Sequence, residues 1–191
     1  TVAATPGNVV FRNEVLEVIQ YTPTTAKVGK RPMLVIPPQI NKYYILDLAP
    51  GRSLFEHLVG EGHQVFAVSW RNPGPEHRDW NLDTYCAAIL EATDAALDIT
   101  GSSDLNILGV CAGGITQAAL LGHLAAIGDT RIRSASFLVT IIDWNVPSMM
   151  GTMISRPVVE AATRRSQRQG ILQGEDLSKI FAWLRPNDLV W

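Results

Sequence analysis

The run Gly109-Val110-Cys111-Ala112-Gly113 constrains the fold of this chain more than any other feature of its sequence. An apolar run typical of a strand, Asn106 to Gly109, leads into it, and a small-residue segment with helical spacing, Gly113 to Ala126, follows it. A nucleophilic side chain flanked by glycines at such a junction indicates a sharp, strained turn from strand to helix. Both glycines are needed because a side chain at either position would collide with the neighbouring strand or helix.

The same turn predicts a reactive thiol. Cys111 is expected to stand above the sheet at a helix N-terminus, whose partial positive charge favours the thiolate form. The backbone N–H of Ala112 is then one donor to an oxyanion, and the second donor comes from the loop after an earlier strand, Pro38-Gln39-Ile40. Gln39 and Ile40 are both candidates for this second N–H, and Ile40 is favoured.

A structural role is the alternative for both cysteines. Free cysteine is among the most buried residue types, and an isolated motif of this form is more often a plain turn. For Cys111, the strand before it and the helix after it favour the nucleophile. Cys86 lies in an alanine-rich helical segment without such a context, and it is interpreted as a small core residue.

Strand-like and helix-like segments alternate along the chain. Short apolar runs predict strands at residues 9–11, 15–21, 33–36, 65–68, 106–109 and 137–142, the first two as a pair near a sheet edge. Helical spacing predicts helices at residues 53–60, 83–99 and 113–126, with Asp83 capping the second and Gly101 ending it. The alternation predicts an α/β protein with a mostly parallel sheet and flanking helices, and together with the cysteine turn it indicates the α/β-hydrolase fold. From Asn145 onward polar helices follow one another without a strand, which indicates a region over the sheet rather than in it.

Composition excludes several classes of protein. The chain has 191 residues, 47% of them hydrophobic, which is enough for one sizeable core. A formal net charge of -2 with scattered basic residues argues against a nucleic acid partner. Two cysteines are too few for a disulfide scaffold or a cysteine-built metal site, so no metal is expected and a reducing cytoplasm fits best.

The sequence also argues against membrane insertion and secretion. No stretch reaches the roughly 18 consecutive apolar residues of a spanning helix, and the first residues contain no signal-type apolar block. The chain opens without Met and stops at the apolar Leu189-Val190-Trp191, so sequence is expected to be missing on both sides.

The partners that a thiol nucleophile needs are not evident. In this fold the acid and the histidine base follow the nucleophile in chain order, whereas three histidines precede Cys111: His57, His63 and His77. His123 follows by only twelve residues on the same predicted helix and is expected to point away from the turn. Asp143 ends a predicted strand, where a triad acid can lie, and its alternative role is a cap or loop anchor. The base is therefore predicted to be absent from this chain.

Longer strings of sequence resemble the poly(3-hydroxyalkanoate) synthases, bacterial enzymes that polymerise 3-hydroxyacyl-coenzyme A into storage polyester. The resemblance covers essentially the whole chain and rests on four strings: Pro37 to Tyr44, Val68 to Pro73, Gly109 to Gly114 and Ala182 to Leu189. Three features are closer to the medium-chain synthases, namely Gln39, Ile99 to Ser102 and Arg185 to Asp188. The string Tyr43-Tyr44-Ile45-Leu46 departs toward the short-chain pattern.

The resemblance carries implications for the site and the domains. It implies that Cys111 holds the growing acyl chain, and that the histidine and aspartate of its triad lie in a C-terminal portion outside this chain. It implies a partial α/β-hydrolase core at residues 1–144, the beginning of a cap or lid at residues 145–191, and a missing N-terminal domain. The coenzyme A thioester is a substrate rather than a cofactor, and no cofactor-binding residue is assigned. The expected location is the cytoplasm, at the surface of polyhydroxyalkanoate granules, and self-association into a homodimer is left open.

Some arginines and aromatic residues have both a functional and a structural interpretation, and other functions are possible for the chain. Basic residues that could face the coenzyme's phosphates, or form an ordinary solvated surface, are Arg71, Arg78, Arg164, Arg165 and Arg168. Aromatic residues that could line an acyl channel, or belong to the core, are Tyr43, Tyr44, Trp70 and Trp80. The competing functions are a thioesterase or esterase of the same fold, and an inactive truncated protein that binds granules or a partner.

Overall fold

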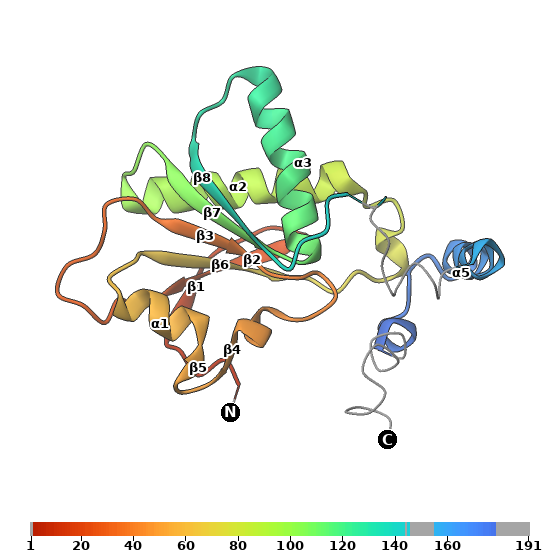
Figure 1. Ribbon diagram of the computed structural model, residues 1–191, viewed down its shortest axis with the longest axis horizontal. Coiled ribbons are helices and arrows are strands. Elements are labelled where there is room, and N and C mark those ends of the chain that lie inside the picture. The colour runs from red at the N-terminus through yellow and green to blue at the C-terminus, as the bar shows by residue number, and fades with distance from the viewer. Residues whose placement is uncertain (1, 144, 146–154, 179–191) are drawn as a thin grey trace. The chain divides into compact units, whose positions relative to one another are not determined.

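The structure, a computed structural model, describes residues 2–143, 145 and 155–178 (Figure 1). Its internal contacts divide the chain into two compact units. The first comprises Thr1–Arg71 and Asn81–Ile142, and the second comprises Asn72–Trp80 and Asp143–Trp191. Helix α5 (Arg156–Gln169) belongs to the second unit, and all the strands described below belong to the first. The role of residues 145–191 as the beginning of a cap stays a prediction.

A six-stranded sheet forms the centre of the first unit, in the order β1-β2-β6-β3-β7-β8. Its strands are β1 (Gly7–Arg12), β2 (Leu16–Tyr21), β3 (Met33–Ile36), β6 (Val65–Trp70), β7 (Leu105–Val110) and β8 (Ile132–Leu138). Strands β6, β3, β7 and β8 are parallel; beyond β6, β2 pairs antiparallel with β6 and β1 pairs antiparallel with β2. The predicted sheet, mostly parallel with a strand pair at one edge, is confirmed. Its four parallel strands place their carboxyl ends along one edge, which is where sites form in such sheets.

Helices cover both faces of this sheet. Figure 1 shows α1 (Leu54–Gly60) on one face and both α2 (Leu82–Thr100) and α3 (Ala112–Ile127) on the other. Because both faces are covered, the central strands are continuous apolar runs, and the last three side chains of β3 are fully buried. The shorter elements are η1 (Tyr43–Leu46), η2 (Pro75–His77), β4 (Asp47–Ala49) and β5 (Arg52–Ser53).

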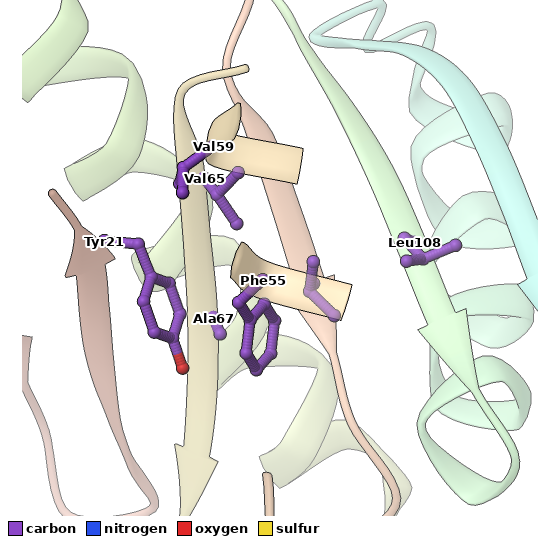
Figure 2. Packing of buried hydrophobic residues seen from close by; sticks show 7 residues of the cluster. Tyr21, Phe55, Val59, Val65, Ala67 and Leu108 are labelled. Carbon is purple, nitrogen blue, oxygen red and sulfur yellow. The ribbon is translucent and has the colours of Figure 1, made fainter. Parts of the chain in front are cut away.

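Stacked aromatic rings hold α1 against the sheet. The rings of Tyr21 and Phe55 have centroids 4.4 Å apart and an interplanar angle of 20°. Figure 2 shows Phe55 of α1 beside Ala67 of β6, with Tyr21 reaching in from β2. Burial, together with the nearby Asp47 and Tyr43, raises the pKa of the Tyr21 phenol, so this group stays neutral. Apolar packing of Phe55 therefore helps to hold α1, which lies between β3 and β6, against the sheet.

Helix α2 begins at a capping box on Asn81, and the prediction that Asp83 caps it is wrong. The Asn81 side chain accepts a hydrogen bond from the backbone N–H of Thr84 (3.0 Å), and the Thr84 hydroxyl accepts one from the backbone N–H of Asn81 (3.2 Å). Asp83 lies inside the first turn instead, where its charge is favourable next to the helix N-terminus. At the other end Gly101 adopts a φ of 63° and ends the helix, as predicted.

Removing this cap is expected to destabilise the first unit. Asn81→Ala should lower the free energy of unfolding by about 1 kcal/mol, because the first amides of α2 lose their acceptor. Asp83→Ala removes only a favourable charge and should cost about 0.5 kcal/mol. Urea-induced unfolding of the two variants compares these losses. A larger loss for the Asp83 variant than for the Asn81 variant would contradict the assignment.

Strand β8 lies earlier in the chain than the strand predicted at residues 137–142, so that prediction is wrong in its bounds and in its burial. The register of β8 is set by pairing with β7, as far as the pair Val110 and Leu138. The strand ends there because Val139 has a φ of 44°, which lies outside the β region. Within the described residues β8 is the edge of the sheet, so its side chains after the first are exposed.

Asp143 consequently follows an irregular segment rather than a strand, and the reason for considering it a triad acid is wrong. Its Oδ1 accepts hydrogen bonds from the backbone N–H (2.9 Å) and from the side-chain Nδ2 (3.1 Å) of Asn145. These contacts are those of a loop anchor, the alternative role that the sequence allowed.

Candidate active site

Cys111 forms the turn between β7 and α3. Its backbone has φ 54° and ψ -122°, a conformation that residues with a side chain rarely adopt and that costs on the order of 1–3 kcal/mol. Three hydrogen bonds hold it: the Cys111 N–H donates to Leu138 O (2.9 Å), and its carbonyl accepts from the amides of Gly114 (3.0 Å) and Ile115 (3.3 Å). The structure therefore has the sharp, strained turn that the motif predicts.

A steric constraint explains why glycine occupies both flanking positions, Gly109 and Gly113. A Cβ on Gly109 would lie 2.6 Å from the Cα of Gly114, and a Cβ on Gly113 would lie closer than 3.0 Å to the carbonyl oxygens of Ile36 and Pro37. These neighbours are backbone atoms, which cannot move aside as a flexible side chain can. The predicted collisions with the neighbouring strand and helix are confirmed.

The loop after β3 runs beside this turn. Its Pro37 carbonyl lies where a Cβ on Gly113 would collide with it, and it accepts a hydrogen bond from the buried indole Nε1 of Trp70 (2.9 Å). Ile40 follows in the same loop with 41% of its surface exposed, and Ala112 opens α3. The first amides of a helix have no acceptor within the helix, so the Ala112 N–H is available to a ligand by position. The loop of Ile40 and the turn of Ala112 are brought together, whereas their roles as oxyanion donors stay predictions.

A family model described as the alpha/beta hydrolase fold matches residues 32–167, which is most of the chain. This chain belongs to the α/β-hydrolase fold family. An ester hydrolase from the metagenome of Lake Arreo has a similar structure, with a TM-score of 0.58 and 19% identity over 80% of this chain and 49% of that chain. At that identity the likeness concerns the fold alone, and the fold that the sequence predicted is confirmed.

Curated relatives of this α/β hydrolase have much higher identity. Residues 1–58 match the family model of the poly-beta-hydroxybutyrate polymerase (PhaC) N-terminus. Poly(3-hydroxyalkanoate) polymerase 1 of Ectopseudomonas oleovorans is 49% identical over 185 residues, 97% of this chain and 33% of the relative. Poly(3-hydroxyalkanoate) polymerase 2 of the same organism is 50% identical over 190 residues, 99% of this chain and 34% of the relative. The chain thus spans about a third of the length of these relatives, and the resemblance to poly(3-hydroxyalkanoate) synthases is confirmed.

The second cysteine of this α/β hydrolase lies in a different environment. Cys86 is half-buried on α2, and its thiol points to the backbone carbonyl of Thr116 on α3 at 3.7 Å. Burial, and to a lesser degree the nearby Asp83 carboxylate, raise the pKa of the Cys86 thiol. A raised pKa leaves less thiolate at a given pH, so Cys86 is the less nucleophilic thiol by environment.

Alkylation at pH 8 is therefore expected to distinguish the two thiols. Iodoacetamide should modify Cys111 at least about 10-fold faster than Cys86, because Cys111 lies at a helix N-terminus whereas burial raises the pKa of the Cys86 thiol. Mass spectrometry of tryptic peptides at successive times gives the two rates. Equal inertness of both thiols would favour a structural cysteine at position 111.

Three histidines lie in the first unit. His57 and His123 are exposed on α1 and α3, and His123, twelve residues after Cys111, lies roughly 18 Å along the helix from it. His63 precedes β6 whereas Cys111 follows β7, so these two lie at opposite ends of parallel strands. None of the three is placed to take a proton from Cys111. A base outside this chain stays a prediction.

The fourth histidine, His77, lies in the second unit and is almost fully buried there. Its Nδ1 accepts a hydrogen bond from the Gly74 amide (2.8 Å), and its ring packs on Trp80 with centroids 4.1 Å apart. These contacts give His77 and Trp80 a role in the packing of that unit.

Two more of the candidate aromatic residues pack in the core. Trp70 is 8% exposed and packs edge-to-face on Tyr85, with ring centroids 5.5 Å apart. Tyr43 packs against the cluster of buried residues drawn in Figure 2. Tyr44 is 39% exposed and belongs to the surface. Packing in the core, rather than lining of an acyl channel, is therefore the interpretation that fits Trp70 and Tyr43.

Several of the candidate arginines contact their own chain. Arg71 donates to the Glu14 carbonyl at 3.4 Å and lines a shallow pocket of about 310 Å³. Arg78 donates to the Gln167 carbonyl at 3.2 Å, and Arg165 lies 3.3 Å from a carboxylate oxygen of the same unit. Such exposed pairs contribute little to stability and fit a solvated surface.

The described residues show no metal centre and no membrane span. No group of three or more His, Cys, Asp or Glu side chains among them is placed to hold a metal ion. None of the described helices combines the length and the apolar character that crossing a bilayer demands.

Proposed function

We propose that this chain carries the nucleophile of an acyltransferase that polymerises (R)-3-hydroxyacyl-coenzyme A into polyhydroxyalkanoate. The observation that carries the proposal is Cys111 on a strained turn with positive φ, in a chain 49–50% identical to curated poly(3-hydroxyalkanoate) polymerases. A strained residue held at the mouth of a parallel sheet is the arrangement by which this fold presents a nucleophile.

The proposed cycle begins with the Cys111 thiolate. Its sulfur attacks the carbonyl carbon of the coenzyme A thioester, and the negative charge moves to the carbonyl oxygen, which accepts hydrogen bonds from the N–H groups of Ala112 and Ile40. Collapse of this oxyanion breaks the bond to the coenzyme sulfur, and the departing thiolate takes a proton. The acyl group is then held as a thioester on Cys111 until an incoming hydroxyl attacks it, which forms an ester, passes the hydroxyl proton to the general base and releases the Cys111 thiolate. Exchange of one thioester for another is nearly balanced, which suits an enzyme that keeps acyl groups transferable.

The base that activates the incoming hydroxyl is proposed to be a histidine, oriented by an aspartate, that this chain does not contain. None of the first-unit histidines is placed beside Cys111, and Asp143 anchors a loop. The chain by itself is therefore inactive in the cycle. The full-length protein that contains it acts in the cytoplasm at granule surfaces, prefers medium-chain substrates and uses no cofactor other than its coenzyme A substrate. Its assembly as a homodimer is left open.

The product assay tests this proposal. Full-length protein is incubated with (R)-3-hydroxydecanoyl-coenzyme A, and free coenzyme, polymer and acylated Cys111 peptide are measured together. Polymer with an acyl group on Cys111 is expected. Release of free hydroxy acid without polymer would identify a thioesterase, and absence of any turnover would favour a protein that only binds granules or a partner.

A further inference from the structure

Oxyanion donors act only when they are fixed in place. A donor contributes when its N–H lies about 2.7–3.1 Å from the developing oxyanion, and a displacement of about 1 Å has large effects on rate. Ala112 is held by α3, whereas Ile40 lies on a loop, and loops are mobile by default. The loop from Pro37 to Ile40 therefore needs contacts that hold it beside α3.

The first of these contacts is at the start of the loop. The buried Trp70 indole donates to the Pro37 carbonyl at 2.9 Å, and the same carbonyl lies so near Gly113 that an added Cβ there would be closer than 3.0 Å to it. This bond fixes the residue after β3, but it leaves the three residues up to Ile40 without a backbone bond to α3 among the described residues. A second contact is needed near Ile40 itself.

Gln39 supplies that contact from the residue directly before Ile40. Its side-chain Nε2 donates to the hydroxyl of Thr116 at 2.9 Å, and this hydroxyl donates to the carbonyl of Ala112 at 3.2 Å. A hydroxyl has one proton to donate and two lone pairs to accept with, so both bonds exist at the same time. Thr116 is 2% exposed, so water has little access to its hydroxyl and competes little for these two hydrogen bonds.

A threonine hydroxyl that bonds to the carbonyl one turn earlier is common in helices and by itself indicates nothing. The bond from Gln39 is different because it comes from another part of the chain. It makes the Thr116 hydroxyl a bridge between the residue before Ile40 and the residue after Cys111. Those two neighbours are where the proposed oxyanion donors lie.

We propose that Gln39 and Thr116 are positioning residues that hold the N–H groups of Ile40 and Ala112 at a fixed separation. The inference rests on the proposed function and deepens it. We assign neither side chain a contact with the substrate. Their loss should leave the thiol of Cys111 intact and weaken only the stabilisation of the oxyanion.

Stopped-flow acylation of the full-length protein by (R)-3-hydroxydecanoyl-coenzyme A tests this pair. Thr116→Val keeps the shape of the side chain and removes both hydrogen bonds, so the acylation rate at saturating substrate should fall about 10-fold with little change in KM. Thr116→Ser keeps the hydroxyl and should remain within about 2-fold of the unchanged protein. Gln39→Leu, on a partly exposed loop, should lower the acylation rate as much as Thr116→Val does. The double variant with both substitutions should have no lower acylation rate than either single variant.

Alkylation of Cys111 by iodoacetamide separates positioning from general damage. That reaction displaces iodide and forms no oxyanion, so its rate should be unchanged in all variants. Acylation at the normal rate in Thr116→Val and Gln39→Leu would overturn the inference, and so would equal losses of acylation and alkylation, which indicate a distorted turn. If the unchanged protein is alkylated at Cys111 but forms no acyl-enzyme, the proposed function fails and this inference fails with it.

Discussion

Full-length protein with Cys111→Ala is expected to form no measurable polyester, with a rate lower by on the order of 10⁵-fold. The substitution removes the only atom of this residue that can attack a thioester. It should leave the turn intact, because cysteine and alanine both carry a Cβ and bear the same strain at φ 54°. Release of coenzyme A, measured with a thiol reagent, and polymer yield give the rate.

Cys111→Ser is the more stringent variant, because a serine hydroxyl fits the same space. A hydroxyl ionises far less readily than a thiol, so acylation should fall by on the order of 10³-fold. The acyl groups that do form should be lost to water more often than they are extended, since an oxygen ester does not exchange evenly with thioesters. Normal polymer synthesis by either variant would mean that Cys111 is not the nucleophile.

Gly113→Ala is expected to have the largest effect on folding. The added Cβ would overlap the carbonyl oxygens of Ile36 and Pro37, and both belong to backbone that the central sheet holds in place. Forcing a methyl group into such a site costs about 3 kcal/mol, the upper part of the range for overpacked cores. Relief of the overlap requires α3 to move away from the loop, so activity should fall as well.

The same helix offers a matched control. A Cβ on Gly122 would meet no atom within 4 Å, and alanine favours a helix interior over glycine by up to about 1 kcal/mol. Gly122→Ala should therefore stabilise the chain slightly while Gly113→Ala destabilises it strongly. Thermal unfolding of both variants is the measurement. Similar midpoints for the two would show that the space at Gly113 is not limiting.

The elements that the sequence predicts well are those whose pattern has a single physical explanation. The short continuous apolar run Met33–Ile36, stopped by Pro37-Pro38, favours a strand covered on both faces, and the structure has β3 there. The glycines around Cys111, placed between a strand and a helix, indicate a close approach of backbone, and the structure shows which atoms approach. Local sequence is sufficient in these cases because the constraint itself is local.

The wrong predictions have equally specific causes. Asn81 and Asp83 are both good capping residues, and only the backbone path into α2 decides between them. Strand β8 contains Arg133, Ser134 and Ser136, so its pattern is too polar for a buried strand. The apolar run that begins at Phe137 led instead to the prediction of a strand at residues 137–142. The position of β8 follows from its register with β7, which a local pattern does not contain.

The contact between Gln39 and Thr116 shows a second limit of local sequence. In the sequence alone, Gln39 is a common polar loop residue and Thr116 is a common threonine within a helix. Only the fold brings them to 2.9 Å. A candidate nucleophile can be predicted from its motif, whereas a contact between distant segments can be found only from the fold.

One hydrogen bond at the Cys111 turn bears on the order in which the chain folds during synthesis. The Cys111 amide is held by Leu138, the last residue of the next strand along the chain. A nascent chain folds from its N-terminus as it leaves the ribosome, so the cysteine emerges before the strand that holds it in the strained form. Until that strand is made, the turn lacks one of its three hydrogen bonds, so the strained conformation should be complete only after β8 has formed.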